Sequence, residues 1–170
     1  MASKDQQFES LVKSFYQPLY RFAYWTCRSR STAEDLVQET FARAWKNFHQ
    51  LQDITSAKPW LFTILHRENA RRFERKQLPL VALNEEWQLE QITDGRDDIE
   101  TMMIRREIYK LPDQFREPLA LQVIGGLSTQ DIADILETNL NTTSTRLFRA
   151  RAELKKQLTE IPHTRGNKNG

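Results

Sequence analysis

Residues 128–151 read STQDIADILETNLNTTSTRLFRAR, and this stretch has the spacing of a helix-turn-helix. Ser128, with Asp131 three residues later, is typical of a capping box that opens a short helix. A break over residues 137–140 then leads into a longer basic helix, expected over about 141–158. Small or polar residues at the start of such a second helix suit entry into the major groove of DNA. The alternative is a plain helical hairpin with a solvated basic face.

The rest of the chain is also expected to be helical. Its 170 residues include only five glycines, and no useful length of sequence alternates like a strand, so the sequence predicts an all-α protein. The other predicted helices cover about 8–26, 32–48, 58–77, 98–110, 114–124 and 128–136. Ser31 with Glu34, or Thr32 with Asp35, is expected to cap the second of them.

The distribution of charged residues indicates two domains. Residues 84–100 carry seven acids against one base, whereas residues 67–76 and 141–158 are base-rich. Such blocks indicate two basic surfaces joined by an acidic connector. We therefore expect two small helical domains joined by an acidic flexible linker. The predicted ranges are residues 1–77, a linker over 78–97, residues 98–160, and a frayed tail over 161–170.

Composition argues against several classes of protein. Cys27 is the only cysteine, so neither an intrachain disulfide nor a cysteine-based zinc site can form. The three histidines lack metal-ligand spacing, there is no glycine-rich phosphate loop, and no convincing catalytic triad is present. We therefore expect no metal, no cofactor and no enzymatic activity. The N-terminus lacks the apolar core of a signal peptide, which predicts a cytoplasmic protein without membrane insertion.

The second helix is expected to have one apolar and one polar face. Leu36, Val37 and Phe41 fall on the apolar stripe. The opposite side carries Asp35, Gln38, Glu39, Ala42, Arg43 and Lys46. The helix macrodipole favours an acid such as Asp35 in the first turn, but it does not explain why Gln38 and Glu39 share its face.

The third helix changes character along its length. Its first half, around Trp60 and Ile64, is apolar, and its second half is a basic rod with scattered aromatic side chains. Aromatic and guanidinium planes can stack on unpaired bases while other cations follow the phosphates. The groups of both kinds are Phe62, His66, Arg67, Asn69, Arg71, Arg72 and Phe73. A solvated face with ordinary core contacts is the alternative interpretation.

Together these segments resemble the extracytoplasmic-function (ECF, group IV) sigma factors of the sigma-70 family of bacterial RNA polymerase. Residues 33–41, AEDLVQETF, followed by Ala44-Trp45, resemble the polymerase-binding signature of that family. Residues 58–64, KPWLFTI, resemble the start of the segment that melts and recognises the −10 promoter element. Residues 132–136, IADIL, with Thr142 and RLFRAR at 146–151, resemble the segment that recognises the −35 element.

The resemblance implies a factor that binds core RNA polymerase and directs promoter recognition. The implied partners are the β′ clamp helices and the β flap of the polymerase, promoter DNA as duplex and as non-template single strand, and an anti-sigma factor. The implied polymerase contacts are Asp35, Gln38, Glu39 and Arg43. The implied −10 contacts are Trp60, Phe62, His66, Arg67, Asn69, Arg71 and Arg72, and the implied −35 contacts are Thr142, Ser144, Thr145, Arg146, Phe148 and Arg149.

The chain departs from the family pattern at a few positions. Arg67 stands where many members have asparagine, with Asn69 two residues further on. Glu137 replaces the usual glycine at the end of the first helix of the helix-turn-helix, which requires either a different turn or a strained one.

A stand-alone helix-turn-helix regulator with an N-terminal helical sensor domain is the alternative function. It would explain residues 98–160 but would leave the polar face of the second helix and the basic rod without a role. Such a protein would bind duplex DNA specifically without polymerase.

Overall fold

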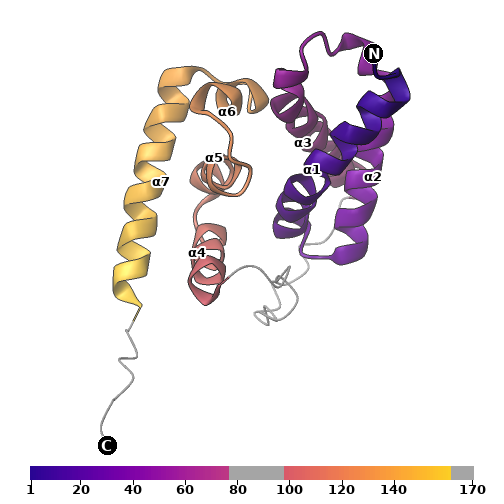
Figure 1. Ribbon diagram of the computed structural model, residues 1–170. Coiled ribbons are helices and arrows are strands. Elements are labelled where there is room, and N and C mark those ends of the chain that lie inside the picture. Colours follow the sequence, from indigo (N-terminus) through magenta and orange to yellow (C-terminus); the bar gives the residue numbers. More distant parts are fainter. Residues whose placement is uncertain (77–97, 162–170) are drawn as a thin grey trace, which may run out of the picture.

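The computed structural model describes residues 1–76 and 98–161, and every regular element within these ranges is a helix (Figure 1). The all-α prediction is therefore confirmed for the described part of the chain. The predicted acidic linker, and the predicted tail from residue 162 onward, lie outside the described residues.

Three long helices form the N-terminal domain. Its elements are α1 (Lys4–Cys27), α2 (Arg30–Lys46), the short 3₁₀ helices η1 (Phe48–Gln50) and η2 (Ile54–Ser56), and α3 (Ala57–Lys76). Helices α1, α2 and α3 all contact one another. Their shared core contains Leu19, Val37 and Leu61, each 0% exposed.

The junction between α1 and α2 is tighter than predicted. Arg28 ends α1 with a left-handed φ of 56°, and its backbone N–H donates to the carbonyl of Tyr24 at 2.7 Å. The chain enters α2 at once, because Ser29 is the N-cap and its hydroxyl accepts from the backbone N–H of Thr32. The predicted cap at Ser31 or Thr32 is wrong, since both residues already lie inside the helix.

Four helices form the C-terminal domain. They are α4 (Ile99–Tyr109), α5 (Asp113–Val123), α6 (Thr129–Ile135) and α7 (Leu140–Glu160). The long α7 contacts each of the other three. Ile108, Leu121 and Leu147, each no more than 1% exposed, anchor this core.

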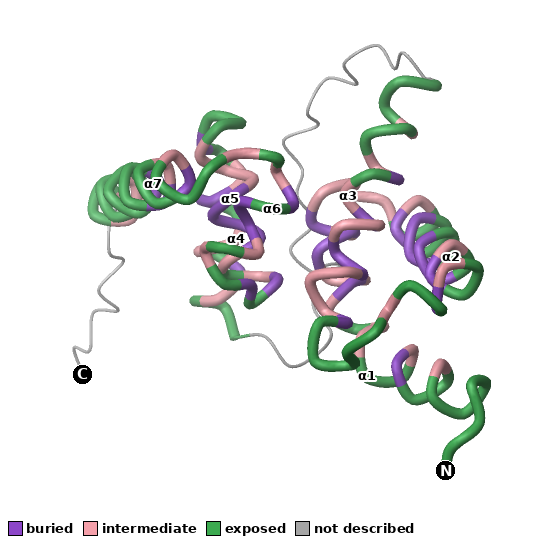
Figure 2. Tube along the Cα trace, turned by 90° about the horizontal axis from the view of Figure 1, so that it is seen from above, coloured by how far each residue is buried: buried purple, intermediate pink, exposed green. Residues whose placement is uncertain are grey.

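The two domains pack against each other. The Trp25 indole Nε1 donates to the carbonyl of Arg105 at 3.2 Å, and its ring meets Tyr109 edge-on with centroids 5.7 Å apart. The Arg28 guanidinium carbon lies 3.2 Å from the centre of the same Tyr109 ring. Figure 2 shows buried residues on α3, α5 and α6, and α3 contacts α6 directly. The buried residues of both domains form one continuous core.

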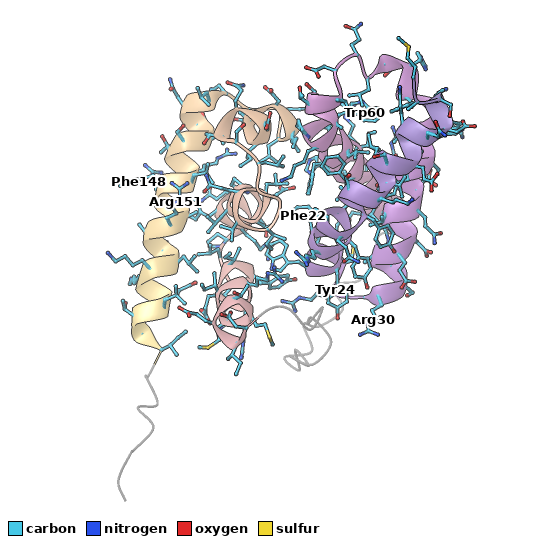
Figure 3. All side chains as sticks on the ribbon, viewed as in Figure 1. Phe22, Tyr24, Arg30, Trp60, Phe148 and Arg151 are labelled. Carbon is cyan, nitrogen blue, oxygen red and sulfur yellow. The ribbon has the colours of Figure 1, made fainter. Side chains whose placement is uncertain are left out.

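Phe62 of α3 lies at the centre of this contact. It is 1% exposed, and its ring meets Phe22 of α1 edge-on at 5.6 Å; Figure 3 places Phe22 on the side of α1 that faces the C-terminal domain. At Gly125, after α5, a Cβ atom would lie 3.3 Å from the Phe62 ring and 2.6 Å from the carbonyl oxygen of Leu121. Glycine at this position therefore lets the turn approach α3.

We expect Gly125→Ala to lower the free energy of unfolding by about 1–3 kcal/mol, because the added methyl group overfills a packed site. Urea denaturation of the whole chain measures this value. Val123→Ala is the control, because Val123 is 50% exposed and surface truncations usually cost about 0.5 kcal/mol or less. Equal stability of the two variants would contradict the tight packing of Gly125 against the Leu121 carbonyl and the Phe62 ring.

Candidate nucleic-acid interface

Helices α6 and α7 form the helix-turn-helix, and each has a side-chain cap. The Ser128 hydroxyl accepts from the backbone N–H of Asp131 at 3.1 Å, which confirms the predicted start of α6. The Asn139 Oδ1 accepts from the backbone N–H of Thr142 at 2.7 Å and begins α7. Both caps satisfy backbone donors that the first turn leaves unpaired. The break covers residues 136–139, one residue earlier than predicted.

The turn between these helices has a left-handed residue. Glu137 has a φ of 53°, in the region where glycine is favoured at the end of a helix. The backbone N–H of Thr138 donates to the carbonyl of Ala133 at 2.9 Å. This bond across five residues is the 6→1 hydrogen bond of a Schellman motif. Of the two alternatives for this turn, the structure therefore has the strained one: the usual turn geometry with a non-glycine residue in it.

The first turns of α7 present a mixed polar and aromatic surface. Ser144, Thr145 and Arg149 are exposed, and Thr142 and Arg146 are half-buried. Phe148 is 74% exposed, and in Figure 3 it points away from the rest of the protein. The predicted −35 contacts thus lie together on α7, four of them fully at the surface.

Arg151 has a different role from its neighbours on α7. Its guanidinium Nη2 bonds the Gln122 Oε1 near the end of α5. This bond fixes α7 against α5 near the exposed face. The sequence pattern does not reveal it, because the two residues are 29 positions apart.

The predicted −10 residues on α3 lie in several environments. Arg67 is exposed, and Trp60 and Asn69 are half-buried. The His66 Nδ1 lies 3.0 Å from the Glu117 Oε1 of α5, so its imidazole faces the C-terminal domain. One residue of the α3 face is therefore held by a contact with α5.

Two predicted −10 residues are engaged in internal contacts. Phe62 is a core residue, so as placed here it packs between domains and does not face nucleic acid. The Arg72 Nη2 donates to the Thr32 hydroxyl at 2.9 Å, and its Nη1 lies 3.9 Å from the Cys27 sulfur. Periodicity could not separate these two from Arg67, because the partners come from other helices.

The predicted polymerase-binding residues gather on the outer side of α2. Asp35, Gln38 and Glu39 are exposed, opposite the buried Leu36 and Val37. Arg43 differs from these three because its Nε lies beside two carboxylates. Its Nε donates to the Glu39 Oε1 at 3.1 Å and also contacts the Glu68 Oε1 of α3.

Cys27 lies between α1 and α3. Burial raises the pKa of its thiol, and the positive charge of Arg72 opposes that effect. The thiol is therefore favoured over the thiolate at neutral pH, which makes Cys27 a poor nucleophile. Within residues 1–76 and 98–161, no three His, Cys, Asp or Glu side chains group as a metal site. No helix in the same ranges is long and apolar enough to cross a membrane.

Family models match both domains. Residues 11–78 match the model described as Sigma-70 region 2, and residues 101–154 match the model described as Sigma-70, region 4. The first model covers α2 and α3, and the second covers the helix-turn-helix.

Whole-chain relatives agree with these matches. The chain is 32% identical to RNA polymerase sigma factor YlaC of Bacillus subtilis (strain 168), covering 89% of this chain and 92% of the relative. It is 28% identical to the ECF RNA polymerase sigma factor SigW of the same organism, covering 91% and 90% of the two chains.

Solved structures share the fold. The sigma factor RpoE of Bartonella quintana, in complex with the anti-sigma factor NepR, superposes with a TM-score of 0.70 at 24% identity, covering 92% of this chain and 99% of that one. CnrH, in complex with the cytosolic domain of CnrY, gives a TM-score of 0.68 at 22% identity, covering 94% and 92%.

We expect Glu137→Gly to raise the free energy of unfolding by about 0.5–1 kcal/mol, since glycine removes the left-handed strain but adds entropy to the unfolded chain. Thermal and urea unfolding measure the change. Thr138→Gly is the control, because the left-handed residue is its neighbour and Thr138 gains no such relief. Its expected effect is a loss of about 0.5–1 kcal/mol. A similar loss in both variants would contradict the strained turn.

Proposed function

The chain belongs to the extracytoplasmic-function sigma factors of the sigma-70 family, and from this membership we propose which of its surfaces bind polymerase and which bind DNA. It directs promoter recognition in transcription initiation. The stand-alone regulator is not favoured, because the region 2 match covers α2 and α3, which that function leaves unused. We propose that the chain acts by binding alone, without catalysing a reaction.

We propose that the outer face of α2 docks on the clamp helices of the polymerase β′ subunit. Three polar side chains support this surface: Asp35, Gln38 and Glu39, all exposed and opposite the apolar side of the helix. Arg43 is proposed as the residue that fixes the Glu39 carboxylate, since the two are bonded at 3.1 Å.

For the −10 element, we propose that α3 binds unpaired bases of the non-template strand. Trp60, His66 and Asn69 would contact bases, while Arg67 and Arg71 would follow phosphates. Base capture of this kind offsets the unstacking penalty of about a few kcal/mol per base. Phe62 is left out of this surface because it is 1% exposed.

We propose that this −10 surface is only partly available in the packed arrangement. Arg67 and Arg71 are exposed there, whereas the His66 Nδ1 is held 3.0 Å from the Glu117 Oε1 of α5. We propose that the packed arrangement is that of the unbound protein and that the domains separate on the promoter. The sigma factor RpoE was solved in complex with the anti-sigma factor NepR, and we propose that this chain has an anti-sigma partner too.

For the −35 element, we propose that α7 enters the major groove. Thr142, Ser144, Thr145 and Arg146 would approach base edges, and Arg149 would meet a phosphate. The observation that carries this proposal is the 74% exposure of Phe148 on the polar start of a long helix. An exposed aromatic ring there can contact a thymine methyl group.

Transcript mapping tests the proposed function as a whole. Purified protein would be added to sigma-free bacterial core polymerase and fragmented genomic DNA, and transcript starts would be mapped with and without it. We expect discrete starts that share two upstream elements and appear only with the protein. Specific duplex binding by the protein alone, without any such starts, would favour the stand-alone regulator.

We expect Arg149→Ala to weaken binding to duplex DNA that carries the mapped −35 element. If Arg149 meets a phosphate, the slope of log affinity against log salt should become shallower by about 0.9. Fluorescence anisotropy over a salt series measures both quantities. Arg106→Ala, which removes an exposed cation of α4, is the control and should leave the slope unchanged. The same slope in both variants would remove Arg149 from the interface.

A further inference from the structure

Glu68 is a buried carboxylate on the helix proposed to bind DNA. It lies on α3, it is only 8% exposed, and its side chain contacts α2. A buried carboxylate without partners costs several kcal/mol, so its position has to be matched by cations. Its spacing from the buried Leu61 and Leu65 places it on the inner face of α3, although it stands within a basic rod.

Two arginines from different helices meet one oxygen of Glu68. Arg71 of α3 places its Nη1 3.2 Å from the Oε1, and Arg43 of α2 contacts the same Oε1 through its Nε. Arg43 is also the donor to Glu39 at 3.1 Å. The four side chains therefore form a chain in the order Glu39, Arg43, Glu68, Arg71.

The two ends of this chain lie on different proposed binding surfaces. The Glu39 side chain is 52% exposed on the polar face of α2, and the Arg71 side chain is 47% exposed on α3. The link between them is shielded, because the Glu68 side chain is 9% exposed and interactions at partly buried sites are weakly screened by salt. A change of charge at Glu39 can therefore alter the electrostatic interactions of Arg71.

We propose that Glu68 is a positioning residue that couples polymerase binding at α2 to single-strand DNA binding at α3; this inference rests on the proposed function of those two surfaces. In the unbound protein, Glu39 and Glu68 share Arg43, and Glu68 also holds Arg71. A DNA phosphate must then compete with Glu68 for the Arg71 guanidinium.

Polymerase binding changes this balance. A lysine or arginine of the polymerase that pairs with Glu39 withdraws this carboxylate from Arg43. Arg43 then pairs only with Glu68. The Arg71 guanidinium is no longer needed to neutralise Glu68 and can bind a phosphate oxygen. Because coupling between two binding sites is reciprocal, single-strand DNA tightens polymerase binding by the same factor.

Glu68→Gln tests the coupling, with Glu74→Gln as the matched control. Both variants remove one negative charge from α3, but Glu74 is exposed rather than buried against α2. The probe is a fluorescent oligonucleotide carrying the non-template strand of a mapped promoter. Its affinity is measured by anisotropy for the full chain alone and for the chain bound to core polymerase.

We expect Glu68→Gln to bind the oligonucleotide about threefold more tightly in the unbound protein, the range of one released ion pair. The salt slope should steepen by about 0.7, as for one added phosphate contact on a single strand. With core polymerase present, the gain should shrink toward onefold, because Arg71 is already released. Glu74→Gln should change the affinity by the same factor in both states.

A second variant tests the other end of the chain without disturbing a buried site. Glu39→Gln should reproduce the tighter oligonucleotide binding of the unbound protein, although Glu39 lies on α2. Asp35→Asn, which removes an exposed charge from the same face, should not. Thermal unfolding confirms that each variant is folded.

Two results would overturn the coupling. One is that Glu68→Gln and Glu74→Gln change the affinity equally in both states, which leaves only a long-range charge effect. The other is that Glu39→Gln behaves like Asp35→Asn. If the unaltered chain fails to bind core polymerase, or fails to bind the oligonucleotide when polymerase is present, the proposed function fails instead. The comparison of variants is then not the test that decides.

Discussion

The fold depends on the packing of one aromatic side chain, Phe62, between the two domains. Its ring meets Phe22 of α1 at 5.6 Å and would lie 3.3 Å from a Cβ atom at Gly125, so it belongs to the core of the N-terminal domain and to the domain contact at once. Burial of an aromatic side chain is among the larger apolar contributions to stability. One face of helix α3 therefore packs in the core, and its other residues are proposed to bind DNA.

Several charged side chains of α3 already have partners in the unbound protein. Arg71 and Arg43 share a buried carboxylate, Arg72 is bonded to Thr32, and His66 pairs with Glu117, so much of the polar surface is held in place before any ligand arrives. Held side chains lose less entropy on binding, but each ligand must displace an existing partner. The proposed binding surfaces are thereby linked to one another and to the domain contact.

The sequence predicts features formed by residues close together in the chain, and it does not predict contacts between residues of different helices. The helix-turn-helix and the Ser128 cap could be predicted because each involves residues within a few positions. At Glu137 the sequence left a different turn and a strained one as alternatives, and the structure has the strained one. The α2 cap was misplaced because capping pairs occur at several neighbouring positions and only the end of α1 at Arg28 selects Ser29. The roles of Phe62 and Glu68 could not be predicted, since their partners lie on other helices.

In the proposed function, the packed domains separate when the protein engages polymerase and promoter. Spin labels at Gln17 of α1 and Gln130 of α6, both exposed, in a chain with Cys27 replaced by serine, would report the distance between the domains. Pulsed electron paramagnetic resonance should give one short, narrow distribution for the unbound protein and a longer one with core polymerase and promoter DNA. An unchanged distribution would contradict the claim and would require α3 to bind DNA with α5 still in place.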